Sequence, residues 1–230
     1  DHTAPGKKRS EEWWQIYEAP YKEQYHSTRF VTERTQQFIK ESCEGDEPWM
    51  ALCSYPDPHH PMCPPGPWFD RHSPDDMLLP QSRHDPLEHA PAHLRLFQGV
   101  HPAKQRDWVA PCGFGNDRLL SQAIAATYGM IEMVDEGVGQ ILRQLEELGV
   151  RDNTIIVFTS DHGDMMGDHG LFLKGFMHYR GTLQVPLIID APGMPALRSC
   201  GLSSSIDIAP TLLELCSLAG YDGIQGKSLT

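Results

Sequence analysis

The sequence predicts an α/β fold in which a mixed, largely parallel sheet is flanked by helices. A β-branched and aromatic run of strand length occupies residues 154–158, and a second apolar run follows at 185–190. A stretch at 117–148 repeats its apolar residues every three or four positions, as an amphipathic helix does. Helices that alternate with short apolar strands indicate a layered α/β architecture.

The remaining elements follow in chain order. Residues 1–28 mix aromatic and charged side chains without a period, and we expect them to pack irregularly against the rest. The segment at 28–43 has helix-compatible apolar spacing. Residues 49–55, WMALCSY, have the composition of a strand. Residues 207–219 form the last predicted helix, with a proline in its first turn.

The composition limits the functional classes. The 230 residues carry a formal net charge of −12, so nucleic-acid binding, which usually needs a basic surface, is not expected. No apolar run reaches the roughly 20 residues of a membrane-spanning helix. The six cysteines form no C-x-x-C pair, and we expect free thiols. Unpaired cysteines and the absence of a recognisable signal peptide favour a cytoplasmic location.

The richest polar stretch follows the strand at 154–158. Three aspartates and two histidines occupy the nine positions 161–169, and functional groups collect beyond the carboxyl ends of strands in α/β sheets. Asp161 and His162 offer an oxygen and a nitrogen that can bind a divalent cation. Two ligands do not define a metal site, so a polar turn without a metal is the alternative. Lys174 adds a positive charge to this acidic loop.

Two further segments are candidates for the same site. His59 and His60 follow the strand predicted at 49–55, in a loop whose six prolines exclude regular structure up to residue 67. Carboxyl ends of parallel strands meet at one sheet edge, so we expect this loop to lie near Asp161. A surface turn with incidental histidines is the alternative. Residues 70–112 form a long, loop-rich insertion that suits a lid or a specificity element.

Five segments, in matching order and spacing, resemble the sulfatase family of the alkaline phosphatase superfamily, which includes phosphonate and phosphate ester hydrolases. They are PHHP at 58–61 with the prolines that follow, YGMIEMVDEGVGQIL, TIIVFTSDHGDMMGDHGLFLK, HYRGTLQVPLIIDAPG, and SIDIAPTLLELCSLAG with GKSL at 226–229. The resemblance covers roughly residues 28–228. It implies an alkaline phosphatase-like fold, of which residues 1–230 form the middle and later part of the catalytic domain.

The resemblance also implies roles for individual residues. Those that match Asp161 and His162 bind the active-site cation in the family. One divalent cation is expected, Ca²⁺ first, with Mg²⁺, Mn²⁺ or Zn²⁺ as alternatives. His59 and Lys174 match residues that contact the sulfate or phosphate oxygens, and His178 is a further candidate for substrate binding.

One departure from the family pattern bears on the chemistry. The C-x-P-x-R motif, whose cysteine becomes the formylglycine nucleophile, does not occur, because Pro67 stands where the arginine after Cys63 would be. We expect the nucleophile in an amino-terminal part that this chain lacks. The resemblance then implies metal-dependent hydrolysis of small-molecule sulfate esters. Phosphate or phosphonate ester hydrolysis is one alternative, and a catalytically inactive binding or assembly fragment is another.

Overall fold

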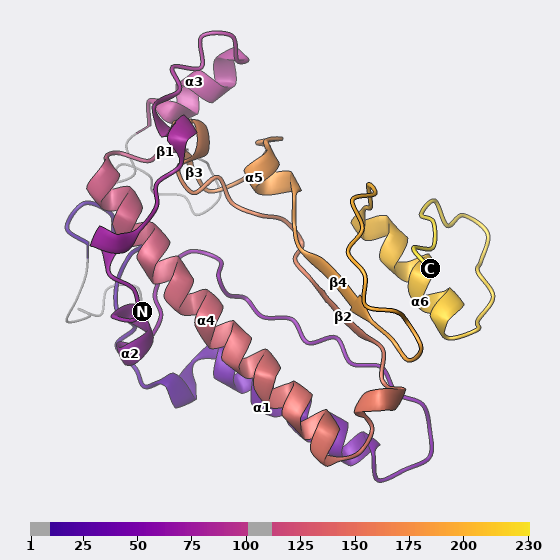
Figure 1. The fold of residues 1–230 in the computed structure, drawn as a ribbon. Coiled ribbons are helices and arrows are strands. Elements are labelled where there is room, and N and C mark those ends of the chain that lie inside the picture. The colour runs from indigo at the N-terminus through magenta and orange to yellow at the C-terminus, as the bar shows by residue number, and fades with distance from the viewer. Residues whose placement is uncertain (1–9, 101–111) are drawn as a thin grey trace. The chain divides into compact units, whose positions relative to one another are not determined.

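The computed structural model describes residues 10–100 and 112–230. The chain divides into two compact units (Figure 1). The first combines Asp1–Arg151 with His162–Gln184, and the second combines Asp152–Asp161 with Val185–Thr230. Part of the predicted insertion, residues 101–111, lies outside the described residues.

Two long helices that lie side by side dominate the first unit (Figure 1). They are α1 (Ser27–Ser42) and α4 (Asp117–Glu147), and both confirm the sequence prediction. Gly137 of α4 faces Thr32 of α1, where a Cβ atom would lie only 2.5 Å from the threonine Oγ1. A side chain at position 137 would therefore force the helices apart, which explains one of the helix glycines.

The core of the first unit lies at the amino-terminal end of α4. Leu119 and Leu120 are fully buried there, together with Trp13 from the irregular amino-terminal stretch. The Trp13 ring stacks on Phe172, with 5.0 Å between the ring centroids. The predicted irregular packing of the first residues therefore supplies part of the core.

The other elements of the first unit, inside and outside the predicted insertion, are short. They are η1 (Glu23–Tyr25), α2 (Gly66–Phe69), η2 (Pro74–Asp76), η3 (Gln81–His84), α3 (Ala92–Gln98), β1 (Cys112–Gly113), η6 (Asp168–Gly170), β3 (Leu171–Phe172) and α5 (Arg180–Leu183). The expectation that prolines exclude regular structure up to residue 67 is wrong at its end. Helix α2 begins there because proline is tolerated in a first helical turn, where no backbone N–H is needed.

The second unit is built on a two-stranded sheet. Strands β2 (Ile156–Thr159) and β4 (Leu187–Asp190) confirm the two predicted apolar strands. They pair antiparallel, with Ile156 opposite Asp190. Helix α6 (Ile208–Leu215) follows η7 (Ser205–Asp207), whose Ser204 and Asp207 form a capping box. The 3-10 turn η5 (Arg151–Asn153) precedes β2.

The largely parallel sheet is not confirmed. The other described sheet pairs β1 with β3, also antiparallel. The strand predicted at 49–55 is not formed either, because no described segment pairs with it; Met50 and Leu52 are 77% and 86% exposed. In the second unit, Phe158 and Ile188 on the paired strands are 40% and 59% exposed.

Two sequence expectations can be compared with the described residues directly. None of the six cysteines, all of which lie in the described ranges, forms a disulfide. Across residues 10–100 and 112–230, no helix is long and apolar enough to cross a membrane.

Candidate functional site

Residues 163–174 form a hairpin-like loop, the site hairpin, in the first unit. The Met165 N–H donates to the Leu173 carbonyl at 2.9 Å, and the Gly167 N–H donates to the Leu171 carbonyl at 2.8 Å. Its tip is η6, where Gly167 and Gly170 adopt the positive φ values of 95° and 74° that glycine accepts easily. The hairpin therefore separates its tip from a base formed by residues 163–164 and 173–174.

The base of the site hairpin carries a pair of opposite charges. Lys174 Nζ lies 3.9 Å from Asp164 Oδ2, and the two side chains are 16% and 21% exposed. The other carboxylate oxygen of Asp164 accepts the Met166 N–H at 3.0 Å. Burial raises the pKa of Asp164, and the charge of Lys174 acts in the opposite direction. The lysine thus lies beside a partly buried carboxylate.

The predicted metal ligands stand next to this base in the sequence. Asp161 is the last residue of the first segment of the second unit, and His162 opens the hairpin segment of the first. Both side chains are exposed. His162 Nδ1 lies 2.9 Å from the Gly163 carbonyl oxygen, so in the neutral ring Nδ1 carries the proton and Nε2 is the atom able to bind a cation.

This donor set fits a divalent cation but does not complete its coordination. Within the described ranges, His, Cys, Asp and Glu side chains form no group of three or more that could hold a metal ion. Asp161 supplies an oxygen and His162 a nitrogen, a combination that several divalent cations accept. The ligand role of this pair stays a prediction.

His59 lies in a second loop of the first unit, which is tied to the start of α1. Asp57, two residues before it, accepts a hydrogen bond from Thr28 Oγ1 and lies 3.4 Å from His26 Nδ1. Burial raises the pKa of Asp57 and lowers that of His26. His59 itself is exposed, stacks on the buried His60 with 4.0 Å between ring centroids, and directs Nδ1 to the His60 carbonyl at 2.6 Å.

Residues of the insertion form hydrogen bonds with the tip of the site hairpin. Ser82 Oγ donates to Asp168 Oδ1 at 2.8 Å, and His169 Nδ1 lies 2.7 Å from Asp85 Oδ2. Gln98 Nε2 donates to the His169 carbonyl at 3.0 Å. The Tyr179 ring stacks on the His169 ring, with 4.1 Å between the ring centroids. These contacts join part of the insertion to a candidate functional loop.

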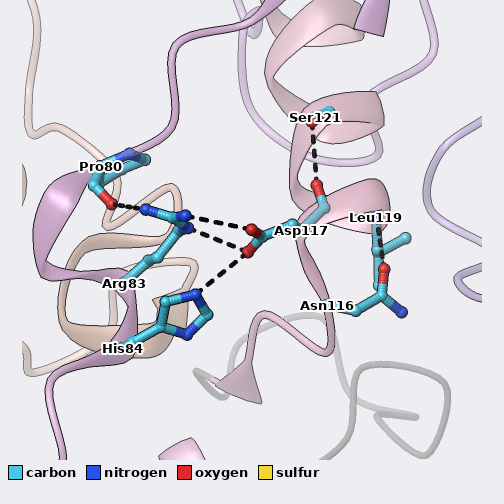
Figure 2. Close-up of polar contacts among 7 residues, drawn as sticks. All are labelled: Pro80, Arg83, His84, Asn116, Asp117, Leu119 and Ser121. Atoms are coloured by element: carbon cyan, nitrogen blue, oxygen red, sulfur yellow. Dashed lines mark hydrogen bonds and ion pairs between the residues drawn. The ribbon is translucent and has the colours of Figure 1, made fainter. Parts of the chain in front are cut away.

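The same segment of the insertion also joins the start of α4 (Figure 2). Arg83 forms two hydrogen bonds with Asp117, Nε to Oδ1 at 3.0 Å and Nη2 to Oδ2 at 3.2 Å. His84 Nε2 approaches the same carboxylate at 3.6 Å. The side chain of Asn116 caps the helix by accepting the Leu119 N–H at 2.9 Å. Segment η3 is thus fixed to both α4 and the hairpin tip.

The structure distributes the five predicted site residues over separate surroundings. Lys174 pairs with Asp164, and His59 stacks on His60. His178 follows the hairpin and is exposed. Asp161 and His162 are adjacent in the chain, but they belong to different units. Asp164 was assigned no role from the sequence, although it is one of the three aspartates of the polar stretch. The Asp164 side chain accepts the Met166 N–H and lies beside Lys174.

Comparison with known proteins gives a consistent family assignment. The sequence model of the Sulfatase family matches residues 3–218. The chain is 33% identical over 216 residues to an arylsulfatase of Clostridium perfringens (strain 13 / Type A), a match that covers 91% of this chain and 42% of the relative. It is 29% identical over 220 residues to the multifunctional alkaline phosphatase superfamily protein PehA of Trinickia caryophylli, covering 90% of this chain and 41% of PehA.

A solved structure supports the same assignment. The phosphonate monoester hydrolase of Agrobacterium radiobacter matches with a TM-score of 0.76 and 28% identity, over 93% of this chain and 43% of the hydrolase. This similarity supports the predicted α/β, alkaline phosphatase-like class. The chain spans less than half the length of each of these relatives. Because the family model matches most of its residues, the chain belongs to the sulfatase family.

Proposed function

We propose that this chain is part of a metal-dependent hydrolase of sulfate esters. The observation that carries the proposal is the sulfatase match over residues 3–218, which includes the loop of His59 and the hairpin of Lys174. The arylsulfatase of Clostridium perfringens supports sulfate as the substrate group. The substrate is then a small-molecule sulfate ester.

The chain's own residues would bind and orient the anion. Negative charge grows on the oxygens of the sulfuryl group during its transfer, and positive side chains that face those oxygens stabilise the transition state. Lys174 supplies a positive charge, and the imidazolium form of His59 would donate its Nε2–H, because Nδ1 is directed to the His60 carbonyl. Both contacts place the ester so that the bond between sulfur and the leaving oxygen can break. His178 would add a contact to the organic part of the substrate.

Asp161 and His162 would hold the divalent cation, Ca²⁺ first among the candidates. When bound, the cation supplies positive charge that stabilises the developing oxyanion and lowers the pKa of a neighbouring nucleophile. Further metal ligands and a formylglycine side chain would come from an amino-terminal part of the complete protein.

Hydrolysis of phosphate or phosphonate esters is the second candidate function. The match to the phosphonate monoester hydrolase of Agrobacterium radiobacter favours it, and both substrates present tetrahedral oxyanions to the same donors. A catalytically inactive binding or assembly role is the third. The nucleophile decides between these functions, since a formylglycine precursor favours sulfate and a threonine or unmodified serine favours phosphate.

Steady-state turnover by the complete protein tests the proposal. The substrates are 4-nitrophenyl sulfate, 4-nitrophenyl phosphate and a phenyl phosphonate monoester, and the expected preference is for sulfate. Asp161→Ala should abolish most of the activity and make it independent of added Ca²⁺, whereas the exposed Asp46→Ala should not. A phosphonate preference would support the second function. No turnover of any ester by correctly folded protein would support an inactive role.

A further inference from the structure

The carboxylate of Asp164 is held in place by the backbone of the site hairpin. One oxygen accepts the Met166 N–H at 3.0 Å, and the Leu173 N–H also donates to this carboxylate. Met166 and Leu173 lie on opposite arms of the hairpin. The carboxylate therefore joins both arms at the base, and its position is fixed before any substrate is present.

The backbone next to Lys174 is also tightly constrained. Leu173 is fully buried and adopts a positive φ of 67°, a conformation that a residue with a branched side chain seldom takes. Such conformations persist where the surrounding structure determines them, and they are frequent at functional sites. The conformation of Leu173 directs the chain so that Lys174 starts beside Asp164.

The contact between the side chains of Lys174 and Asp164 is a loose one. The separation of 3.9 Å between Lys174 Nζ and Asp164 Oδ2 is longer than a normal charged hydrogen bond. A lysine ammonium has three N–H donors, so it can remain near Asp164 and still donate to another anion. A lysine side chain loses rotamer entropy on being fixed, and a fixed neighbouring charge reduces that loss.

We propose that Asp164 is a positioning residue, which orients the ammonium of Lys174 toward the tetrahedral anion of the substrate. This inference rests on the proposed function, in which Lys174 contacts the ester oxygens. It assigns to Asp164 a role beyond holding the hairpin together. Asparagine removes the charge that faces Lys174 and keeps one oxygen that can accept the Met166 N–H, and comparing its effect with and without Lys174 separates the positioning role from a loss of hairpin contacts.

A double-mutant cycle on the complete protein tests the proposal. Asp164→Asn, Lys174→Ala and the combined variant are compared with wild type by kcat/KM and by thermal unfolding. Asp164→Asn should lower kcat/KM about tenfold when Lys174 is present and less than about twofold when it is alanine, since coupled residues are non-additive. The same loss in both backgrounds would mean a purely structural role and would overturn the proposal.

Affinity for inorganic sulfate gives a second readout of the same cycle. Asp164→Asn should weaken sulfate binding only in proteins that retain Lys174. If wild type binds sulfate in this way but hydrolyses no ester, the proposed function fails and the role of Asp164 stands. If wild type does not bind sulfate, the role of Asp164 fails too. Should Asp164→Asn not fold, Asp164→Glu enters the cycle, and an equal loss with and without Lys174 again overturns the proposal.

Discussion

The two ends of the site hairpin are held in different ways. At the tip, Asp168 and His169 make several short contacts with Ser82 and Asp85 of the insertion. At the base, Lys174 has a longer contact with Asp164, and the neighbouring His162 is exposed. The insertion therefore holds the site hairpin at the end remote from Lys174. The base, which carries Lys174 and Asp164, is then supported by a tip that the insertion holds.

The largest expected loss of activity is for a substitution of Lys174 at the base of the hairpin. Lys174→Ala in the complete protein should lower kcat/KM by about a hundredfold or more, because it removes a charge that stabilises the transition state. The thermal unfolding midpoint should also fall, because the variant leaves the partly buried Asp164 carboxylate without the charge of Lys174. The matched control is Lys40→Ala on the exposed surface of α1, for which no loss of activity is expected. Equal losses in the two variants would remove Lys174 from the site.

The variant Asp85→Asn, at the tip contact, should reduce turnover less than Lys174→Ala does but should clearly lower stability. The Leu87 N–H and the His169 ring hold the pKa of Asp85 below its ordinary value. A carboxyl group with a lowered pKa stabilises the fold above its unfolded pKa of about 3.9, and the stabilisation is lost as the pH falls through the lower folded value. Asp85→Asn should therefore lower the unfolding midpoint at pH 7 and change kcat/KM only about threefold.

Urea unfolding between pH 7 and pH 3 measures this effect. The midpoints of wild type and Asp85→Asn should converge as the acid limit is approached. Asp76→Asn, a change at an exposed aspartate of η2, serves as the control. A difference that stays constant over the whole pH range would show that Asp85 does not act through its charge.

The link between η3 and α4 should contribute less. Asp117 is 46% exposed and Arg83 is 25% exposed, so solvent screens their interaction. Asp117→Asn should cost about 1 kcal/mol or less, and less still in 1 M salt, when measured by urea unfolding. The hydrogen bonds and charge of Arg83 hold the pKa of Asp117 below its ordinary value, so the cost should also vanish in acid. A large loss of activity would show that η3 acts on the site directly.

The smallest effect is expected for His178, which lies beyond the hairpin and is exposed. If it contacts the organic part of the ester, His178→Ala should raise KM about twofold and leave kcat unchanged, as loss of uniform binding does. Steady-state kinetics with two aryl sulfates of different size measure the change. An unchanged KM for both would remove His178 from the substrate-binding residues.

The spacing and type of neighbouring apolar residues correctly predicted several helices and strands. The apolar spacing located α1 and α4, and the β-branched runs located β2 and β4. They could not predict the pairing partner of β4 or the missing pairing of residues 49–55, because a strand forms only where a neighbour is present. The largely parallel sheet was inferred from apolar strands that alternate with helices, and that pattern does not fix the direction of each strand.

The candidate site shows the same division. Lys174 was found from its family motif and charge, but Asp164 was not assigned a role, because its importance comes from the fold of the hairpin. The Asp85–His169 contact joins positions 84 residues apart, a distance that no local pattern bridges. The insertion also lacked periodicity, although Ser82, Arg83 and Asp85 each make a specific contact.

Calorimetric titration of the complete protein with inorganic sulfate tests the difference between base and tip most directly. Wild type and Asp85→Asn should bind sulfate with affinities within about threefold of each other, because the tip only supports the base. Lys174→Ala should bind at least about thirtyfold more weakly, since it loses the charge that faces the anion. Equal binding by wild type and Lys174→Ala, or loss of binding only in Asp85→Asn, would contradict the assignment of the hairpin base as the anion site.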